Sequence, residues 1–189
     1  MKQPLLYPDI PPPPYSLEET SDEPEIQHSQ PPLRTYRLRE KGALNGDDFK
    51  VIDVFNKPKF RVRRNFTIFS RNFVIEDMNR MPLIIIKQDK NRFSTFNFIS
   101  VSTSQNLARM KRKYVILRPK FEIDSVYGQY ILEGDSFGFT LSKNGQNVVA
   151  IIRKKMFSWT NRFDMDISEE EDIAFITSIV VVLDQVVFK

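Results

Sequence analysis

Four cations on one short segment are the residues of this chain best placed to do chemistry. Lys57, Lys59, Arg61 and Arg63 occupy every second position, with Phe60 among the residues between them. On a β-strand this spacing puts the four charges on one face, about 6.6 Å apart. Several anionic headgroups, or one phosphoinositide, could bridge them, since each cation near an anionic membrane contributes about 1 kcal/mol. The pattern also fits the solvent-facing side of an ordinary strand.

Two further basic clusters follow, each at the end of an expected strand. They are Arg109, Lys111, Arg112 and Lys113 in one, and Arg153, Lys154 and Lys155 in the other. If the three clusters met in space, they would form a patch that binds anionic lipid; if they lie apart, they are ordinary surface charge. Nucleic acid is disfavoured as a partner, because the chain lacks the glycine-punctuated aromatic pattern of common RNA-binding modules.

An acidic segment raises the question of calcium, whose preferred ligands are hard oxygens. Its members are Asp164, Asp166, Glu169, Glu170, Glu171 and Asp172. The last four are explained more simply as the first turn of a helix, where acidic side chains favour the helix dipole. The spacing is not that of an EF-hand and lacks its glycine. We therefore predict no metal site.

The residue inventory excludes several enzyme classes. The chain has no cysteine, and its one histidine, His28, lies in a polar segment. Cysteine catalysis is impossible, and a Ser-His-Asp triad or a His-ligated zinc site is disfavoured. The six glycines form neither a Walker loop nor a dinucleotide fingerprint. We expect no catalytic residues and no cofactor.

The N-terminal segment contains a short recognition motif. Pro12, Pro13, Pro14 and Tyr15 form a PPxY sequence, which WW domains bind as a preformed polyproline II helix. The alternative is a stiff spacer that happens to end in tyrosine. Both interpretations stay open.

The composition divides the chain into a tail and a body. Residues 1–33 hold nine of the twelve prolines and six acids against one cation, which leaves 27 cations and 18 acids for the remainder. We predict a disordered, proline-rich acidic tail over residues 1–40 and a folded domain over residues 41–189. The chain has neither a signal peptide nor cysteine, which predicts a cytoplasmic protein, peripheral at the inner membrane surface if it binds lipid.

The body reads as short β-branched and aromatic runs separated by turn residues, which is typical of an antiparallel meander. Asn144-Gly145 is the clearest turn, because this dipeptide suits a hairpin with positive φ. The expected strands are residues 49–55, 59–64, 66–69, 72–76, 83–88, 93–101, 113–118, 120–124, 129–133, 137–142, 147–154 and 162–167.

Residues 169–189 are expected to form an apolar helix. Ser168 followed by Glu171 has the pattern of a capping box. The following apolar residues cover every side of the helix, so it must be buried all round. Residues 173–188 span about 24 Å, short of the ~30 Å hydrocarbon core, and Asp184 interrupts them. We therefore predict a helix inside the protein and no transmembrane span.

Strands and helix together predict a barrel. A twelve-strand barrel is too wide for its own side chains to fill, since about eight strands already close a packed interior. A helix about 10 Å across would occupy the remaining space. The predicted fold is mainly β, an antiparallel barrel of about twelve strands that encloses the C-terminal helix.

Several segments in this order resemble the tubby C-terminal-like superfamily, in particular the LURP-one-related proteins, with phospholipid scramblases as more distant relatives. They are FVIED at 73–77, PLIIIK at 82–87, YILEGD at 130–135, VVAIIRK at 148–154, FDMDI at 163–167 and the helix at 172–184. The resemblance covers about residues 45–189 and implies a twelve-stranded barrel around a central helix. Tubby domains bind phosphoinositides, scramblases handle lipids, and many LURP-one-related proteins have no established activity.

The expected function is therefore non-enzymatic binding of anionic membrane phospholipids through basic strand faces. Fold alone does not decide function, so two alternatives stay open. One is an adaptor that WW-domain proteins bind through the PPxY motif. The other is a scramblase-like protein that moves lipid.

Overall fold

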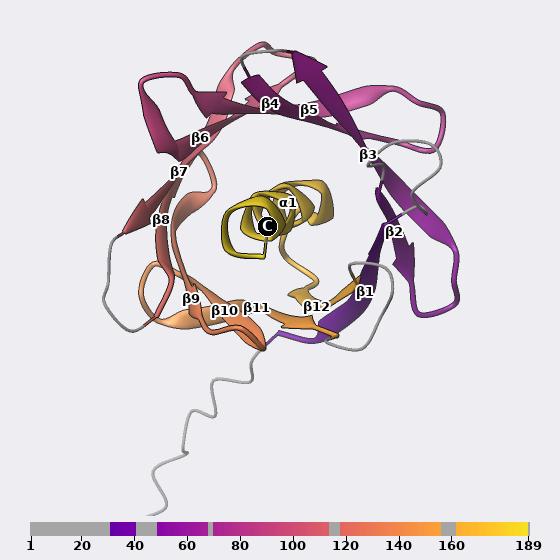
Figure 1. The fold of residues 1–189 in the computed structure, drawn as a ribbon. Helices are drawn as coiled ribbons and strands as arrows, with labels where there is room; N and C mark the ends of the chain where they lie inside the picture. Colours follow the sequence, from indigo (N-terminus) through magenta and orange to yellow (C-terminus); the bar gives the residue numbers. More distant parts are fainter. Residues whose placement is uncertain (1–30, 41–48, 68–69, 114–117, 156–161, 189) are drawn as a thin grey trace, which may run out of the picture.

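The computed structural model describes residues 31–40, 49–67, 70–113, 118–155 and 162–188. Twelve strands form one closed barrel, in which each strand is antiparallel to the next and β1 closes the ring against β12 (Figure 1). The strands are β1 Leu33–Glu40, β2 Phe49–Asp53, β3 Pro58–Thr67, β4 Ser70–Glu76, β5 Pro82–Asp89, β6 Arg92–Ser100, β7 Asn106–Lys113, β8 Lys120–Ser125, β9 Gly128–Gly134, β10 Gly138–Lys143, β11 Asn147–Lys154 and β12 Arg162–Ser168. The predicted fold class is confirmed.

Alternation along the strands separates the inside of the barrel from the outside. On β3, Val62 is fully buried and points inward, while Arg61 and Arg63 on either side of it point outward. β8 repeats the pattern, with Phe121 and Ile123 buried. Because side chains alternate between the two faces of a strand, the apolar positions line the lumen and the charged positions cover the outer wall.

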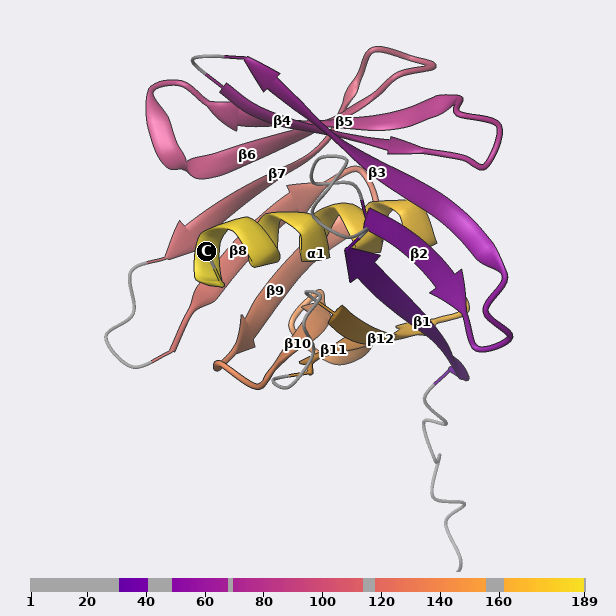
Figure 2. The ribbon, with the colours of Figure 1, turned by 45° about the vertical axis from the view of Figure 1, so that its right-hand side comes forward.

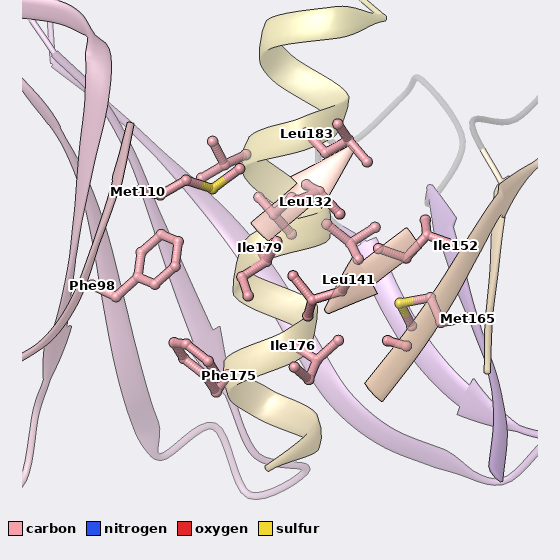
Figure 3. Packing of buried hydrophobic residues seen from close by; sticks show 14 of the residues in the cluster. Phe98, Met110, Leu132, Leu141, Ile152, Met165, Phe175, Ile176, Ile179 and Leu183 are labelled. Atoms are coloured by element: carbon pink, nitrogen blue, oxygen red, sulfur yellow. The ribbon is translucent and has the colours of Figure 1, made fainter. Parts of the chain in front are cut away.

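A single helix, α1 Ile173–Val187, runs through the lumen (Figure 1). Figure 3 shows its apolar side chains directed toward the surrounding strands, and all residues from Ala174 to Gln185 are buried. The neighbours labelled there are Phe98, Met110, Leu132, Leu141, Ile152 and Met165. The barrel and the helix thus bury one another, as the apolar circumference of the helix predicts. No helix in the described ranges has the length and apolar character needed to cross a membrane.

The helix begins later than the sequence predicts. Its N-cap is Asp172, whose side chain accepts a hydrogen bond from the Phe175 N–H at 2.8 Å. The predicted capping box at Ser168 is wrong, because Ser168 ends β12 and pairs with Leu33 of β1. Glu171 instead contacts Tyr130 and Lys143.

Three strand predictions need correction. The expected strands at 59–64 and 66–69 fall on one continuous strand, β3, which ends at Thr67. β7 at Asn106–Lys113 was not predicted: the strand expected at 113–118 overlaps it only at Lys113, and residues 114–117 lie outside the described residues. The segment containing β1 was assigned to the tail, so the barrel begins at Leu33 rather than at residue 41. On β1, only Tyr36 and Leu38 are buried apolar residues. Two such residues are too few to give a recognisable strand pattern in the sequence. Residues 1–30, with the PPxY motif, lie outside the described residues.

The helix gives the barrel two distinguishable ends. We call the end where α1 begins the N end, and the opposite end the C end. Because neighbouring strands are antiparallel, the β2–β3, β4–β5, β6–β7, β8–β9 and β10–β11 turns all lie at the N end. The β2–β3 and β4–β5 turns are seen on the right-hand side of Figure 2. The β10–β11 turn has the predicted positive φ at Asn144 (51°) and Gly145 (76°).

Candidate anion-binding site

The three predicted basic clusters lie on β3, β7 and β11, four strands apart in a ring of twelve. They are therefore about a third of the circumference apart and do not form one patch. The clusters on β7 and β11 lie toward the C end, whereas Lys57 and Lys59 precede or begin β3 at the N end. One contiguous basic patch built from these clusters is excluded.

Many of these cations contact carboxylates on the outer wall. The ion pairs are Lys59 with Asp53 at 3.4 Å, Arg63 with Glu76 at 2.8 Å, Arg109 with Asp89 at 3.6 Å, Lys113 with Glu122 at 2.8 Å, Lys155 with Asp164 at 3.1 Å, and Arg153 with Asp166. Each such surface pair contributes about 0–1 kcal/mol to stability. These pairs neutralise part of the charge that the sequence suggested was available to a ligand.

Lys154 has a different environment. Its Nζ atom lies 3.9 Å from the centroid of the Phe188 ring, at the C end of the barrel. Burial lowers the pKa of Lys154, and the Asp184 carboxylate opposes that shift. The side chain covers the end of the helix, which is a packing role.

Register across β1, β2 and β3 produces a row of cations that sequence reasoning missed. Arg39 on β1 is directly opposite Lys50 on β2, and Lys50 is directly opposite Arg61 on β3. The residues beside them, such as Leu38 and Phe49, are fully buried, so all three cations belong to the outer face. Like charges directly opposite one another destabilise a sheet. The repulsion within this cation row weakens the fold, and Glu76 on β4, directly opposite Arg61, offsets only the part that falls on Arg61.

Next to the row is a pocket of 350 Å³, which we call the cationic pocket. Its lining is Phe49, Lys50, Arg61, Val62, Arg63, Glu76 and Arg80, contributed by β2, β3, β4 and the β4–β5 turn. Four of these side chains are cations and one is a carboxylate. Within the described part of the chain, the buried Nε atom of Arg61 has no hydrogen-bond partner. A bound oxyanion could accept a hydrogen bond from a donor of this kind.

Glu76 organises one side of this pocket. It is 8% exposed, and its Oε1 atom accepts a hydrogen bond from Arg63 Nε at 2.8 Å. That contact fixes the Arg63 guanidinium and leaves its other N–H groups for a ligand. Lys50, Arg61 and Arg80 have no ion-pair partner among the residues that the structure describes.

Arg80 occupies an unfavourable backbone conformation. Its φ is 67°, in the left-handed region, where an ordinary L-residue is disfavoured by roughly 1–2 kcal/mol. Asn56, at the corresponding place in the β2–β3 turn, has a φ of 61°, and asparagine tolerates this region well. An arginine in the same conformation suggests that its side chain has a role in the pocket.

A second polar cluster lies at the N end and is structural. Glu171 accepts hydrogen bonds from the Tyr130 hydroxyl at 2.7 Å and from Lys143 Nζ at 2.8 Å. Burial and the Glu171 carboxylate raise the pKa of Tyr130 well above its usual value. These contacts tie β9 and β10 to the segment that leads into α1, which fixes where the helix starts.

The acidic segment does not assemble into a metal site. In the described ranges, no group of three or more histidine or acidic side chains is arranged to hold a metal ion. Asp164 and Asp166 instead pair with Lys155 and Arg153.

Of the ten predicted lipid-binding residues, the structure brings only Arg61 and Arg63 into the cationic pocket. Lys50, Arg80 and the adjacent Arg39 were missed because they become neighbours only through strand register. Recognising them would have required β1 and its pairing with β2. No sequence pattern predicts that Arg80 has a positive φ.

The fold places this chain among proteins built as a closed twelve-strand antiparallel barrel around a C-terminal helix. The chain belongs to the LURP-one-related family, whose model matches residues 34–184. It is 26% identical over 154 residues to the uncharacterized protein YxjI of Bacillus subtilis, covering 80% of this chain and 93% of that protein. The X-ray structure of an Arabidopsis thaliana protein has the same fold, with a TM-score of 0.61 and 17% identity over 82% of this chain and 93% of that one.

Proposed function

We propose that this protein binds the phosphorylated headgroup of an anionic membrane lipid in the cationic pocket, without catalysing a reaction. The observation that supports the proposal most directly is the cross-strand pair of Lys50 and Arg61. These like charges disfavour the folded barrel when the pocket is empty. A phosphate between them would convert the repulsion into two charge-assisted contacts.

The donors suit a compact phosphate ligand. Arginine presents a planar fork that binds phosphate through two parallel hydrogen bonds, and lysine adds a compact point charge. The 350 Å³ volume is within the range of small-ligand pockets, which suits one headgroup better than a polymer. The proposed site contains fewer of the predicted lipid-binding residues than the sequence suggested, because most of those cations lie elsewhere on the barrel.

Vesicle binding tests the proposal. The full chain is mixed with vesicles of phosphatidylcholine alone, or with added phosphatidylserine and a phosphatidylinositol bisphosphate. We expect binding only to the anionic vesicles, and a loss of about tenfold or more when Lys50 and Arg61 are both changed to serine. The matched control changes Lys90 and Arg92, two exposed cations on the β5–β6 turn, to serine.

Both double variants remove the same charge, so they separate the pocket from a general electrostatic effect. Equal binding by the two variants would exclude this site. Soluble inositol trisphosphate forms a second arm of the experiment, because it carries the headgroup chemistry without a membrane. If it binds but vesicles do not, the ligand is a free phosphate compound rather than a lipid.

The PPxY motif supports a second candidate function, recruitment by a WW-domain protein. Pro12, Pro13, Pro14 and Tyr15 lie outside the described residues, so this proposal rests on the sequence. We expect a WW domain to bind the full chain and Tyr15→Ala to abolish that binding. The Lys50 and Arg61 variants should leave it unchanged.

A further inference from the structure

Two turns at the N end of the barrel are built in the same way. They are the β2–β3 turn, residues 53–57, and the β4–β5 turn, residues 77–81. In the first, the Asp53 N–H donates to the Lys57 carbonyl at 3.0 Å and the Asn56 N–H donates to the Asp53 carbonyl at 3.1 Å. The second turn has the same two hydrogen bonds: the Asp77 N–H donates to the Met81 carbonyl at 3.0 Å, and the Arg80 N–H donates to the Asp77 carbonyl at 3.1 Å.

The side chain of the first residue of each turn also accepts hydrogen bonds from backbone N–H groups within the turn. Asp53 accepts from the N–H groups of Phe55 at 3.0 Å and Lys57 at 2.8 Å. Asp77 accepts from those of Asn79 and Met81, both at 2.8 Å. Burial raises the pKa of the Asp53 carboxyl. The hydrogen bonds that Asp53 accepts and the charge of Lys59 outweigh that effect, so its pKa lies below the usual value. Both turns are therefore held in one conformation before any partner binds.

Each turn presents an exposed apolar side chain beside an exposed cation. Phe55 is 87% exposed and Met81 is 62% exposed. Lys57 lies two residues after Phe55, Arg80 comes directly before Met81, and both cations are exposed. Arg80 also lines the cationic pocket, so the second turn is continuous with the proposed headgroup site.

We propose that these two turns insert Phe55 and Met81 into the interfacial region of an anionic bilayer, with Lys57 and Arg80 at the level of the phosphates. This inference rests on the proposed function and assigns the orientation of the barrel on the membrane. Apolar tips flanked by cations match the two layers of such a surface, acyl chains beneath anionic headgroups. Because the turns are ordered in advance, little conformational entropy is lost on binding.

The β8–β9 turn at the same end provides a contrast. Val126 is 63% exposed there, yet its nearest charged residue in the chain is the exposed Asp124. Tyr127 beside it is close enough to Asp172 for that carboxylate to contribute to its raised pKa, although burial is the larger cause. Lys143, the cation beside this turn, is already paired with Glu171 at 2.8 Å. It therefore offsets little of the negative charge of Asp124 and Asp172, and we expect this tip to stay in water.

The absence of cysteine from the chain allows a direct test. Single cysteines replace Phe55, Met81, Val126 or Phe137 in the full chain and carry a polarity-sensitive fluorophore. Phe137 is 64% exposed in the β9–β10 turn at the C end, so it serves as the distant control. With the anionic vesicles described above, we expect a blue shift and protection from aqueous quencher at positions 55 and 81 only.

A double variant, Phe55→Ser with Met81→Ser, provides an independent measurement. We expect its affinity for anionic vesicles to fall about tenfold, because apolar area is no longer buried. Its affinity for soluble inositol trisphosphate should stay unchanged, since neither side chain lines the cationic pocket. Both residues are exposed, so the variant is expected to fold.

The outcomes distinguish this inference from the proposed function. Vesicle binding with unshifted probes at 55 and 81, or with an unaffected double variant, overturns the insertion and leaves the headgroup site standing. Equal vesicle binding by the Lys50 and Arg61 variant and its control overturns the headgroup site instead. If the wild-type chain binds no anionic vesicle, both proposals are overturned.

Discussion

Lys50 and Arg61 lie directly opposite one another on the outer face of β2 and β3. Their repulsion predicts an unusual pair of effects from one substitution. Lys50→Gln should raise the free energy of unfolding by about 0.2–1 kcal/mol at low salt, because Lys50 has a cation opposite it on both neighbouring strands, while weakening binding to anionic vesicles. Urea unfolding measures the first effect and vesicle sedimentation the second.

Salt supplies the control for this prediction. Added salt screens exposed charges, so the stability gain should shrink between low and physiological ionic strength. A variant that unfolds more easily than wild type at every salt concentration would show that the two cations stabilise the empty barrel.

Arg80 provides a second prediction of the same kind. Arg80→Asn should raise the free energy of unfolding by about 0.5–1 kcal/mol, because asparagine tolerates a φ near 67° better than arginine does. The matched change is Asn56→Arg in the β2–β3 turn, which should lower stability by a similar amount. Thermal unfolding of both variants checks the prediction, and shifts in the same direction would contradict it.

Shortening an apolar side chain of the helix in the lumen should cause a large loss of stability, because it leaves a cavity. Ile179 is fully buried on α1, so Ile179→Ala should lower the free energy of unfolding by about 2–5 kcal/mol. Ile151 is half-buried on the outer face of β11, and the same change there should have a smaller effect. Denaturant unfolding compares the two, and equal losses would mean that the lumen collapses around the cavity.

The Tyr130–Glu171 contact predicts a pH dependence. The pKa of Tyr130 lies above its reference value of 10.0, so the folded state keeps this phenol neutral. The contribution of Tyr130 is complete below pH 10. As the pH rises past 10, the unfolded chain ionises its tyrosine and the folded chain does not, so stability falls.

Tyr130→Phe should lower stability near neutral pH by about 1–3 kcal/mol through loss of the hydrogen bond to Glu171. It should also flatten the alkaline decline in the free energy of unfolding. Denaturant titrations at several pH values measure both effects. An alkaline decline as steep as that of wild type would assign it to other residues.

The barrel and its helix could be predicted because both depend on patterns that extend along the chain. The helix is apolar on every side, and a dozen strand signals before it leave a lumen for it to fill. The wrong helix start has a physical explanation, because a local sequence pattern was overridden by a pairing between strands distant in the chain. Ser168 has the sequence pattern of a helix cap, but its backbone pairs with Leu33, 135 residues away in the chain.

The candidate site could be predicted only in part, for a geometric reason. Arg61 and Arg63 share a strand, so their common face follows from spacing alone. Arg39, Lys50 and Arg61 come from three strands, and a shift of one residue in either pairing would move a cation to the inner face. Charge patterns along the chain therefore locate single strand faces but not the pocket between them.

The position of α1 in the lumen also constrains how the protein is made. The helix follows β12 in the chain, so all twelve strands leave the ribosome before the segment that fills them. Closure of the ring must also wait, since β1 pairs with β12. Contacts this distant in sequence form slowly, and until α1 arrives the apolar inner faces of the nascent strands have no helix to bury them, which favours aggregation.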